Sequence, residues 1–188
     1  MLRRWALEYK SKLTVIRPTV VFGERNRGNV YNLLRQIASG RFVMIGSGTN
    51  RKSMAYVENV ASFIVNRIDH AVETETFNYI DKPDFDMNEL VRLVRRMMGR
   101  TDSVGMRIPY SVGMVVAGLF DVVSQLTGRK FQISRVRVKK FCSNSVYGTA
   151  VDNVDFRPPY PLGDALSRTI NYEFLSTRAN NEQVFFTE

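Results

Sequence analysis

A glycine turn, a cation and an aromatic residue follow one another in the segment MIGSGTNRKSMAY, residues 44–56. Gly46 and Gly48 let the backbone turn and approach a ligand without a Cβ clash. Arg51 follows, and its guanidinium has a permanent charge and a planar set of donors that matches phosphate oxygens. Each charge-assisted hydrogen bond of this kind contributes about 1.5–3 kcal/mol. The segment therefore favours capture of an anionic group, although a turn cap or an ion pair with Glu58 also explains Arg51.

Other residue types that often carry chemistry are few. The chain has one histidine and one cysteine, which argues against a structural zinc site and an internal disulfide and favours a reducing, cytoplasmic compartment. His70 is predicted to complete a helix C-terminus at the surface. Cys142 has no nearby histidine to activate it, and Asp86 and Glu89 are typical of a capped helix start. We therefore expect no metal site and no catalytic residue in this chain.

The positive charge is unevenly distributed along the sequence. The net charge is +9, and residues 1–52 hold 11 Lys and Arg against Glu8 and Glu24, whereas the basic and acidic residues of the remainder cancel. A surplus of this kind indicates an anionic partner, and both phosphate-bearing small molecules and nucleic acid fit it. The run RVRVKK, residues 135–140, has no interleaved aromatic residues, so a solvated face is favoured over nucleic-acid binding.

Apolar runs alternate with amphipathic segments and predict an α/β fold. Strands are expected at 13–22, where a nearly continuous apolar run is typical of a strand buried on both faces, at 41–46 and in ETFNYID. Helices are expected in LRRWALEYKSK, in VYNLLRQIASG with Asn29 as its cap, in NVASFIVNRIDHA, in DMNELVRLVRRMMG, and from near Leu162. SGTNRK is expected to be a turn, and RVRVKK either a helix or a strand.

The longest apolar segment, residues 108–128, is expected to be a buried helix that begins after Pro109. Asp121 and several polar residues interrupt it, so a membrane-spanning helix, or any membrane contact, is not expected. The tail from residue 176 onward is expected to be loose.

Four motifs in order resemble the C-terminal half of extended short-chain dehydrogenases/reductases, and more narrowly the NAD-dependent epimerase/dehydratase family that acts on nucleotide sugars. These motifs are LTVIRPTVVFGE, RGNVYNLLRQIASG, RFVMIGSGTNRKSMAYVENVASFI and FRPPYPLGDALSRTINYE. The resemblance covers about residues 1–174. It implies the C-terminal part of a Rossmann-like doubly wound sheet with a small α/β substrate-binding domain.

The resemblance also implies which residues meet the ligands. The strand matched by VIRPTVVFG ends beside the nicotinamide in the family, so Pro18, Thr19 and Val20 are expected on the cofactor side. The expected substrate contacts are Asn29 at the diphosphate, Val43 and Ile45 at the nucleobase, Arg51 at the diphosphate, and Arg135 as a second phosphate contact. Val20 and Val21 stand where some epimerases and dehydratases carry a substrate-binding Asn.

Two family motifs have no counterpart here. The sequence contains no glycine-rich cofactor loop, and YKSK at Tyr9–Lys12 is one residue too short for the Tyr-x-x-x-Lys pair. The resemblance therefore implies a fragment that binds NAD or NADP mainly through a missing N-terminal Rossmann half and is inactive alone. Residues 1–26 would be the tail end of the dinucleotide-binding domain, 27–174 mostly the substrate-binding region with a return to the Rossmann part, and 175–188 the loose tail.

The expected partners are a nucleoside-diphosphate sugar, the missing half, and a second copy in a homodimer, because family members often dimerise through a helix pair that includes the opening one. Two alternatives remain open. One is a fragment of an extended short-chain reductase acting on an uncharged, sterol-like or flavonoid-like ketone, which the apolar segment 108–126 favours. The other is a non-enzymatic basic module that binds nucleic acid. The sugar, the nucleotide and the reaction outcome are not defined by the sequence.

Overall fold

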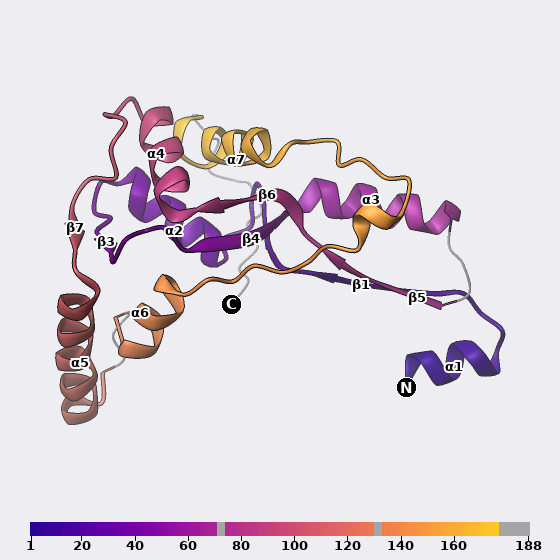
Figure 1. Ribbon diagram of the computed structural model, residues 1–188, viewed down its shortest axis with the longest axis horizontal. Helices are drawn as coiled ribbons and strands as arrows, with labels where there is room; N and C mark the ends of the chain where they lie inside the picture. The colour runs from indigo at the N-terminus through magenta and orange to yellow at the C-terminus, as the bar shows by residue number, and fades with distance from the viewer. Residues whose placement is uncertain (71–73, 130–132, 177–188) are drawn as a thin grey trace. The chain divides into compact units, whose positions relative to one another are not determined.

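The computed structural model describes residues 1–70, 74–129 and 133–176, and it has the expected mixed α/β architecture (Figure 1). Three strand pairs are parallel: β1 (Leu13–Pro18) with β5 (Thr74–Tyr79), β2 (Val20–Phe22) with β4 (Arg51–Tyr56), and β3 (Met44–Ile45) with β7 (Arg107–Ile108). β6 (Asp81–Asp86) lies next to β4 in the order β2-β4-β6. Parallel pairing of strands that are separated by helices confirms the α/β class.

The chain forms two compact units. Unit 1 comprises Met1–Leu34, Ser53–Asp84 and Val146–Glu188, and unit 2 comprises Arg35–Lys52 and Phe85–Ser145. Each unit therefore contains segments that are distant in the sequence.

The first predicted strand is interrupted in the structure. Residues 13–22 form β1 and β2, which are separated at Thr19 and pair with different strands. The backbone N–H of Thr19 donates to the carbonyl of Tyr79 (3.2 Å), while Pro18 has no N–H to donate. The expectation of burial on both faces was wrong, because residues 13–16 are half-buried and Arg17 and Pro18 are exposed. Among the described residues, β5 is the only strand that pairs with β1.

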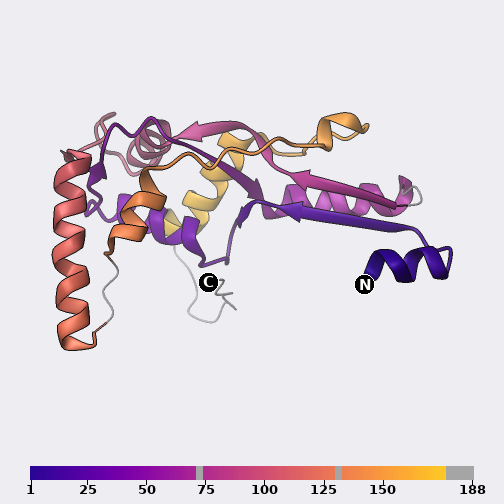
Figure 2. The same cartoon turned by 60° about the horizontal axis from the view of Figure 1, so that its bottom comes forward.

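An aromatic cluster forms the core of unit 1. β1 and β5 run side by side (Figure 1 and Figure 2), and α3 (Val57–His70) supplies Phe63 to the cluster. The ring of Phe63 lies 5.2 Å from those of Phe77 and Tyr79 and 5.0 Å from that of Phe156. Burial of each such ring contributes about 1.5–3 kcal/mol. The apolar period of residues 57–70 therefore positions α3 on this sheet.

A buried carboxylate links three elements of unit 1. Asp81 accepts hydrogen bonds from the backbone N–H of Tyr56 (2.6 Å), the amide of Asn59 (3.0 Å) and the hydroxyl of Tyr79 (3.1 Å). Burial raises the pKa of Asp81, although these three donors oppose the shift. Tyr56 is buried, and its hydroxyl donates to the Glu24 carboxylate at 2.9 Å.

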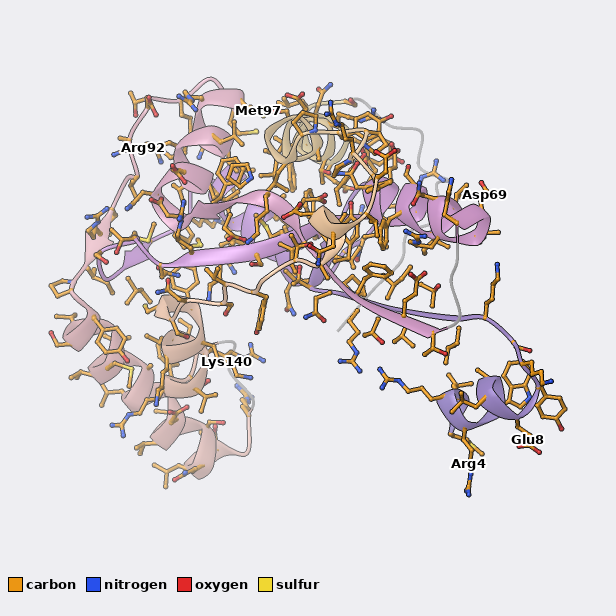
Figure 3. The ribbon with its side chains drawn as sticks, turned by 45° about the vertical axis from the view of Figure 1, so that its right-hand side comes forward. Arg4, Glu8, Asp69, Arg92, Met97 and Lys140 are labelled. Atoms are coloured by element: carbon orange, nitrogen blue, oxygen red, sulfur yellow. The ribbon has the colours of Figure 1, made fainter. Side chains whose placement is uncertain are left out.

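The remaining helices of unit 1 lie near its chain ends. They are α1 (Leu2–Glu8), the 3₁₀ helix η1 (Val151–Asn153), α7 (Leu162–Ile170) and the π-helical turn η2 (Asn171–Leu175). The predicted start near Leu162 is confirmed. α1, marked by Arg4 and Glu8 in Figure 3, buries Ala6 but leaves its large apolar side chains exposed, namely Leu2, Trp5 and Leu7; Tyr9, which follows the helix, is exposed too. His70 is the exposed last residue of α3, as expected, with Nδ1 2.9 Å from the Asn66 carbonyl.

Capped helices build the core of unit 2. α2 (Asn29–Ala38) begins in unit 1 and ends in unit 2, where Arg100 donates to the carbonyl of Ala38 (2.8 Å). α4 (Met87–Met97) has the predicted cap: Asp86 accepts from the N–H of Glu89 (2.8 Å), and the Glu89 carboxylate accepts from the N–H of Asp86 (2.9 Å). Its apolar stripe is buried as Met87, Leu90, Val91 and Val94.

The long apolar segment forms α5 (Tyr110–Thr127), but the prediction that it is buried was wrong. Its buried residues are only Gly113, Ala117 and Gly118. Among the described residues, α5 is also the one helix that is long and apolar enough to cross a membrane. RVRVKK lies in α6 (Arg135–Cys142), a helix capped by Ser134, which accepts from the N–H of Arg137 (3.2 Å).

The charge surplus collects in unit 2. Unit 2 contains 15 Lys and Arg residues and 4 Asp and Glu residues, whereas unit 1 contains 12 and 14. The basic residues of unit 2 are Arg35, Arg41, Arg51, Lys52, Arg92, Arg95, Arg96, Arg100, Arg107, Arg129, Lys130, Arg135, Arg137, Lys139 and Lys140. Of the tail expected to be loose, residues 177–188 lie outside the described residues, whereas Leu175 is the last residue of η2.

Candidate ligand-binding site

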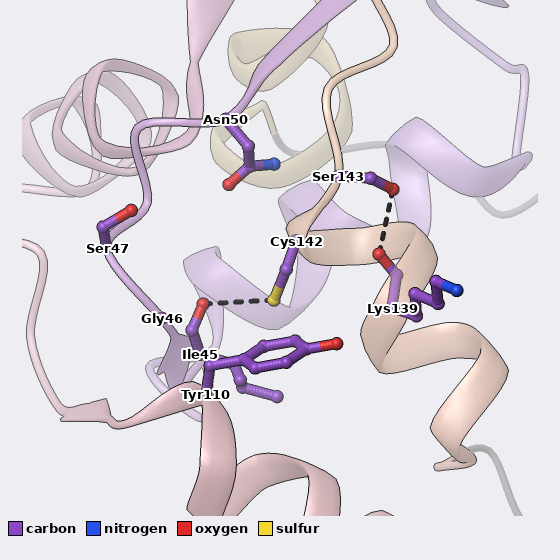
Figure 4. A pocket seen from close by; sticks show the side chains of 8 residues that line it. All are labelled: Ile45, Gly46, Ser47, Asn50, Tyr110, Lys139, Cys142 and Ser143. Carbon is purple, nitrogen blue, oxygen red and sulfur yellow. Dashed lines mark hydrogen bonds between the residues drawn. The ribbon is translucent and has the colours of Figure 1, made fainter.

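A cavity of about 320 Å³ lies within unit 2. Three segments line it: the turn after β3, the first residue of α5, and the last turn of α6 (Figure 4). The lining residues are Ile45, Gly46, Ser47, Asn50, Tyr110, Lys139, Cys142 and Ser143. Its volume is at the lower end of the range for small-molecule sites, about 300–1,000 Å³. A monosaccharide or a nucleobase fits this space better than a complete nucleotide sugar.

Hydrogen bonds from Asn88, near the start of α4, hold the turn at residues 46–50 in place. The N–H of Asn88 donates to the carbonyl of Gly48 (3.0 Å), and the Asn88 amide donates to the carbonyl of Ser47 (3.1 Å). Gly48 has φ +70°, and a Cβ there would lie 2.4 Å from Oδ1 of Asn88. Both the backbone angle and the lack of space require glycine at this position, so the GSG segment shapes one wall of the cavity.

Lys52 and Asn50 hold the end of α6 beside this turn. The ammonium of Lys52 donates to the carbonyls of Lys140 (2.8 Å) and Ser143 (2.6 Å), and the Asn50 amide donates to the carbonyl of Phe141 (2.7 Å). A cation at the C-terminal carbonyls satisfies acceptors that the helix cannot. Burial lowers the pKa of Lys52. The second cation of the segment NRK is therefore structural.

Cys142 lies in the cavity wall with its thiol engaged. Its Sγ donates to the carbonyl of Ile45 (3.3 Å) (Figure 4). Burial raises the pKa of this thiol, and the nearby charge of Lys52 opposes the shift only in part. The thiolate is the reactive form, so the expectation that Cys142 is unreactive agrees with its surroundings.

The cavity combines a cation with hydroxyl groups and an apolar wall. Lys139 is exposed, and its ammonium makes no hydrogen bond or ion pair within the described part of the chain. Ser47 and Tyr110 bring hydroxyl groups, while Ile45 and the Tyr110 ring form the apolar wall. Such a wall suits the face of a sugar or base ring, and the cation and hydroxyls suit an anionic or polyhydroxylated ligand.

The predicted substrate residues of unit 2 are spread over different places. Ile45 lines the cavity, and Val43 is half-buried just before β3. Arg51 is exposed and is the first residue of β4, not part of a turn as expected. Its guanidinium makes no hydrogen bond or ion pair among the described residues, whereas its N–H donates to Asn144 (2.8 Å).

Arg135 is engaged with α5. A Cβ on Gly118 would lie 2.3 Å from Nη2 of Arg135, so the guanidinium lies directly against the backbone of α5. The N–H of Arg135 donates to the Asp121 carboxylate (3.1 Å). Neither Arg135 nor Arg51 lines the cavity.

The predicted residues of unit 1 lie where β1 meets β2 and at the start of α2. Pro18 and Val20 are exposed, and Thr19 between them is half-buried. The Thr19 hydroxyl is buried and has no hydrogen-bond partner among the described residues. Asn29 is exposed as the first helical residue of α2, so the expectation that it precedes the helix as a cap differs from the structure by one position.

Sequence reasoning missed most of the cavity. It pointed to Arg51, whereas the lining residues of the turn are Ser47 and Asn50. Lys139 comes from the run RVRVKK, which was interpreted as a solvated face, and Ser143 follows that run by three residues. The GSG turn was the available signal, but its pairing with the end of α6 is a tertiary contact that no local pattern contains.

The parallel sheets and their helices define the class as Rossmann-like α/β, and solved structures agree. UDP-glucose 4-epimerase from Thermotoga maritima superposes with a TM-score of 0.60 at 19% identity over 91% of this chain and 48% of that structure. UDP-N-acetylglucosamine 4-epimerase from Bacillus cereus does so with a TM-score of 0.61 at 11% identity over 89% and 49%. At these identities the likeness concerns the fold.

Residues 1–79 match the NAD dependent epimerase/dehydratase family. The N-acetyl-α-D-glucosaminyl-diphospho-ditrans,octacis-undecaprenol 4-epimerase of Escherichia coli O157:H7 is 46% identical over 185 residues, which are 96% of this chain and 56% of that protein. UDP-glucose 4-epimerase of Vibrio cholerae is 28% identical over 65% of this chain and 39% of its own length. The chain belongs to the NAD-dependent epimerase/dehydratase family, and it spans about half the length of the relatives it matches.

Proposed function

We propose that this chain is the substrate-binding part of an NAD(P)-dependent epimerase that acts on a sugar joined to a diphosphate. The observation that carries the proposal is the 46% identity, over 96% of the chain, to an epimerase whose name specifies such a substrate. The surplus of cations in unit 2 and the cavity beside the GSG turn support it. In this proposal, residues 1–26 belong to the dinucleotide-binding domain.

The proposed substrate contacts divide between a phosphate part and a ring part. Arg51 binds the diphosphate, because its guanidinium is exposed and makes no hydrogen bond or ion pair among the described residues. Ile45 and Lys139 contact the sugar or base ring in the cavity. Asn29, Val43 and Arg135 remain candidates from the resemblance, and Arg135 would first have to leave its contact with Gly118.

The nicotinamide cofactor would contact this chain at residues 18–20. The buried, unpartnered hydroxyl of Thr19 and the exposed Pro18 and Val20 fit contact with a neighbouring group. When bound, NAD(P) supplies the hydride acceptor for oxidation of a sugar hydroxyl. The role of this chain's residues is to hold the diphosphate and orient the ring, which lowers the barrier through positioning.

A second candidate substrate differs in what the diphosphate is attached to. The epimerase of E. coli O157:H7 is named for a sugar linked through diphosphate to undecaprenol, whereas the epimerases of V. cholerae and T. maritima are named for UDP-glucose. The higher identity to the first favours a polyprenyl diphosphate sugar as an alternative to a nucleotide sugar. The sugar diphosphate is the part common to both.

The uncharged-ketone alternative is supported less than the sugar-diphosphate proposal. It was favoured by the apolar segment 108–126 and by the lack of an Asn near Val20, but of α5 only Tyr110 lines the cavity.

Calorimetric titration of the full chain tests the proposal, using UDP-N-acetylglucosamine and a short-chain polyprenyl diphosphate N-acetylglucosamine as ligands. Binding of at least one is expected. Arg51→Ala should weaken it by about 10- to 150-fold, because a charge-assisted hydrogen bond worth about 1.5–3 kcal/mol is lost. Arg41→Ala, which removes another exposed cation of unit 2, serves as the matched control and should change affinity little.

Two results would overturn the assignment. If neither ligand binds the wild-type chain, the sugar-diphosphate proposal fails. If Arg51→Ala and Arg41→Ala bind equally well, the diphosphate site lies elsewhere in unit 2.

A further inference from the structure

We propose that α5 is a membrane-surface helix, which inserts one exposed apolar face into a lipid bilayer while neighbouring cations bind anionic headgroups. The inference goes beyond the proposed function and does not depend on which sugar diphosphate the chain binds. It reverses the expectation from the sequence that the chain makes no membrane contact.

A continuous apolar face of α5 is exposed to solvent. Leu119 is 64% exposed and Leu126 is 81% exposed. Together with five valines, they form the apolar face of α5: Val112, Val115, Val116, Leu119, Val122, Val123 and Leu126. At 3.6 residues per turn, these positions fall within an arc of about 120° of the helix. An exposed stripe of this length on one element marks an interaction surface.

The opposite side of α5 carries its small and polar residues. Gly113 packs so closely on β3 that a Cβ there would lie 2.6 Å from Cγ2 of Ile45. Ala117 is buried, and Asp121 and Ser124 lie on the same side as these small residues. A surface helix of a globular, water-soluble protein normally buries its large apolar residues and exposes its polar ones. α5 has the reverse arrangement within unit 2.

The same contacts favour a helix that lies on a membrane over one that spans it. The Asp121 carboxylate accepts from the N–H of Arg135, and the Arg135 guanidinium lies against Gly118 near the middle of α5. A spanning α5 would carry both charged groups into the hydrocarbon region, which is unfavourable. A helix in the plane of the interface keeps them on its aqueous side while the apolar face enters the acyl chains.

Cations beside α5 favour an anionic lipid surface. α6 lies next to α5 in both views of the ribbon (Figure 1 and Figure 2). Its Lys139 and Lys140 are exposed, and Figure 3 marks Lys140 on this helix; Arg129, two residues beyond the end of α5, is exposed too. With 15 cationic and 4 acidic residues, unit 2 is complementary to phospholipid headgroups of negative charge.

The charge argues against a second copy of the chain as the occupant of this face. A two-fold interface would use the apolar face of α5 from both copies, because such an interface pairs one patch with itself. It would therefore bring two sets of α6 cations together, and like charges placed opposite one another oppose association.

Vesicle sedimentation of the full chain tests the inference, with vesicles of phosphatidylcholine alone and of phosphatidylcholine with phosphatidylglycerol. Binding to the anionic vesicles is expected, and it should weaken as salt is added. The quadruple change Val115→Ser, Leu119→Ser, Val122→Ser and Leu126→Ser should weaken the vesicle association by about 100-fold or more, because the inserted apolar area is lost. Arg129→Gln and Lys140→Gln should each weaken it by about fivefold.

Matched controls come from unit 1. The change Ile64→Ser, Val65→Ser and Ile68→Ser removes exposed apolar residues of α3, and Lys12→Gln removes an exposed cation; neither should alter vesicle binding. The inference is overturned if the wild-type chain stays in the supernatant with anionic vesicles, or if the α3 change is as harmful as the α5 change. It is also overturned if light scattering shows a dimer that only the α5 change dissociates. Titration with a soluble sugar diphosphate is independent of these outcomes.

Discussion

At the scale of single residues, the cavity wall contains a thiol that can report on its own surroundings. Cys142 is the only cysteine of the chain, so a thiol reagent reads one site. Burial raises its pKa, and its Sγ donates to the Ile45 carbonyl. The thiolate fraction at mildly alkaline pH is therefore smaller than in an unfolded chain.

We expect iodoacetamide to alkylate Cys142 several-fold more slowly in the folded chain than in urea, as measured by mass spectrometry over time. A ligand in the cavity should slow the reaction further. The alkylation rate of Cys142 in the urea-unfolded chain is the reference for a fully accessible thiol. An equal rate in the folded chain would contradict the described position of the thiol.

The hydroxyl of Tyr56 makes a partly buried hydrogen bond that the removal of one oxygen atom abolishes. It donates to the Glu24 carboxylate at 2.9 Å, and Arg168 also pairs with Glu24 at 3.7 Å. Tyr56→Phe should lower the free energy of unfolding by about 1.5–3 kcal/mol, because a hydrogen bond to a charged group is lost. Denaturant unfolding measures it. Tyr147→Phe, at a tyrosine that is 56% exposed, is the control and should have little effect.

Asp81 connects stability to pH. Burial raises its folded-state pKa above the ordinary 3.8, so the folded state binds its proton more tightly than the unfolded state does. This contribution to stability is fully present below the unfolded pKa, and it is lost as the pH rises through the folded pKa.

The unfolding free energy of the wild type relative to Asp81→Asn should therefore decrease as the pH rises from 3.8 and then level off. Urea unfolding of both proteins across this range checks the sign. A difference that grows with pH would mean that the three hydrogen bonds to Asp81 outweigh its burial.

At the scale of elements, the cap of α4 is the clearest case of local control. Asp86 and Glu89 exchange the two hydrogen bonds of a capping box. Asp86→Ala should lower the unfolding free energy by about 0.5–2 kcal/mol. Asp102→Ala is the matched control. Asp102 forms an ion pair with Arg96 (3.5 Å) in which both side chains are more than half exposed, so the pair should contribute about 1 kcal/mol or less. Equal effects of the two changes in thermal unfolding would contradict the cap.

Elements that depend on local pattern were predictable from the sequence. The α4 cap, the start of α7 near Leu162 and the helix after Pro109 follow from residue types at fixed spacing, and all three are confirmed. β1 and β2 were not separable by pattern, because the break at Thr19 depends on different partner strands, β5 and β4. The exposure of α5 was not predictable either, since composition reports that a helix is apolar but not what covers it.

The candidate site was predictable only in outline. The need for glycine at Gly48 follows from a turn, and the GSG segment does form one wall of the cavity. The other wall comes from α6, about 90 residues further along the chain, and nothing local joins Asn50 to the Phe141 carbonyl. Arg51 and Lys52 are neighbouring cations that sequence alone does not distinguish. Side chains alternate along β4, so Lys52 donates to a carbonyl of α6 whereas Arg51 is exposed.

At the scale of the whole molecule, the proposed function makes a prediction about activity. The sequence contains neither a glycine-rich cofactor loop nor a Tyr-x-x-x-Lys pair, and these carry cofactor binding and acid/base chemistry in the family that the chain resembles. We therefore expect no epimerised product when the chain alone is incubated with NAD and UDP-N-acetylglucosamine, as followed by chromatography of the sugar. Turnover that scales with the amount of chain would contradict this.

The unequal charges of the two units have a thermodynamic consequence. Unit 2 has 15 cationic and 4 acidic residues, so its side-chain charges repel one another. Unit 1 has 12 cationic and 14 acidic residues, so its net charge is close to zero. Dissolved ions relieve self-repulsion, so added salt raises the melting temperature of unit 2 more than that of unit 1. We therefore expect heat-capacity scans in dilute buffer to show two overlapping peaks, with unit 2 melting first, and these peaks should merge as the ionic strength increases.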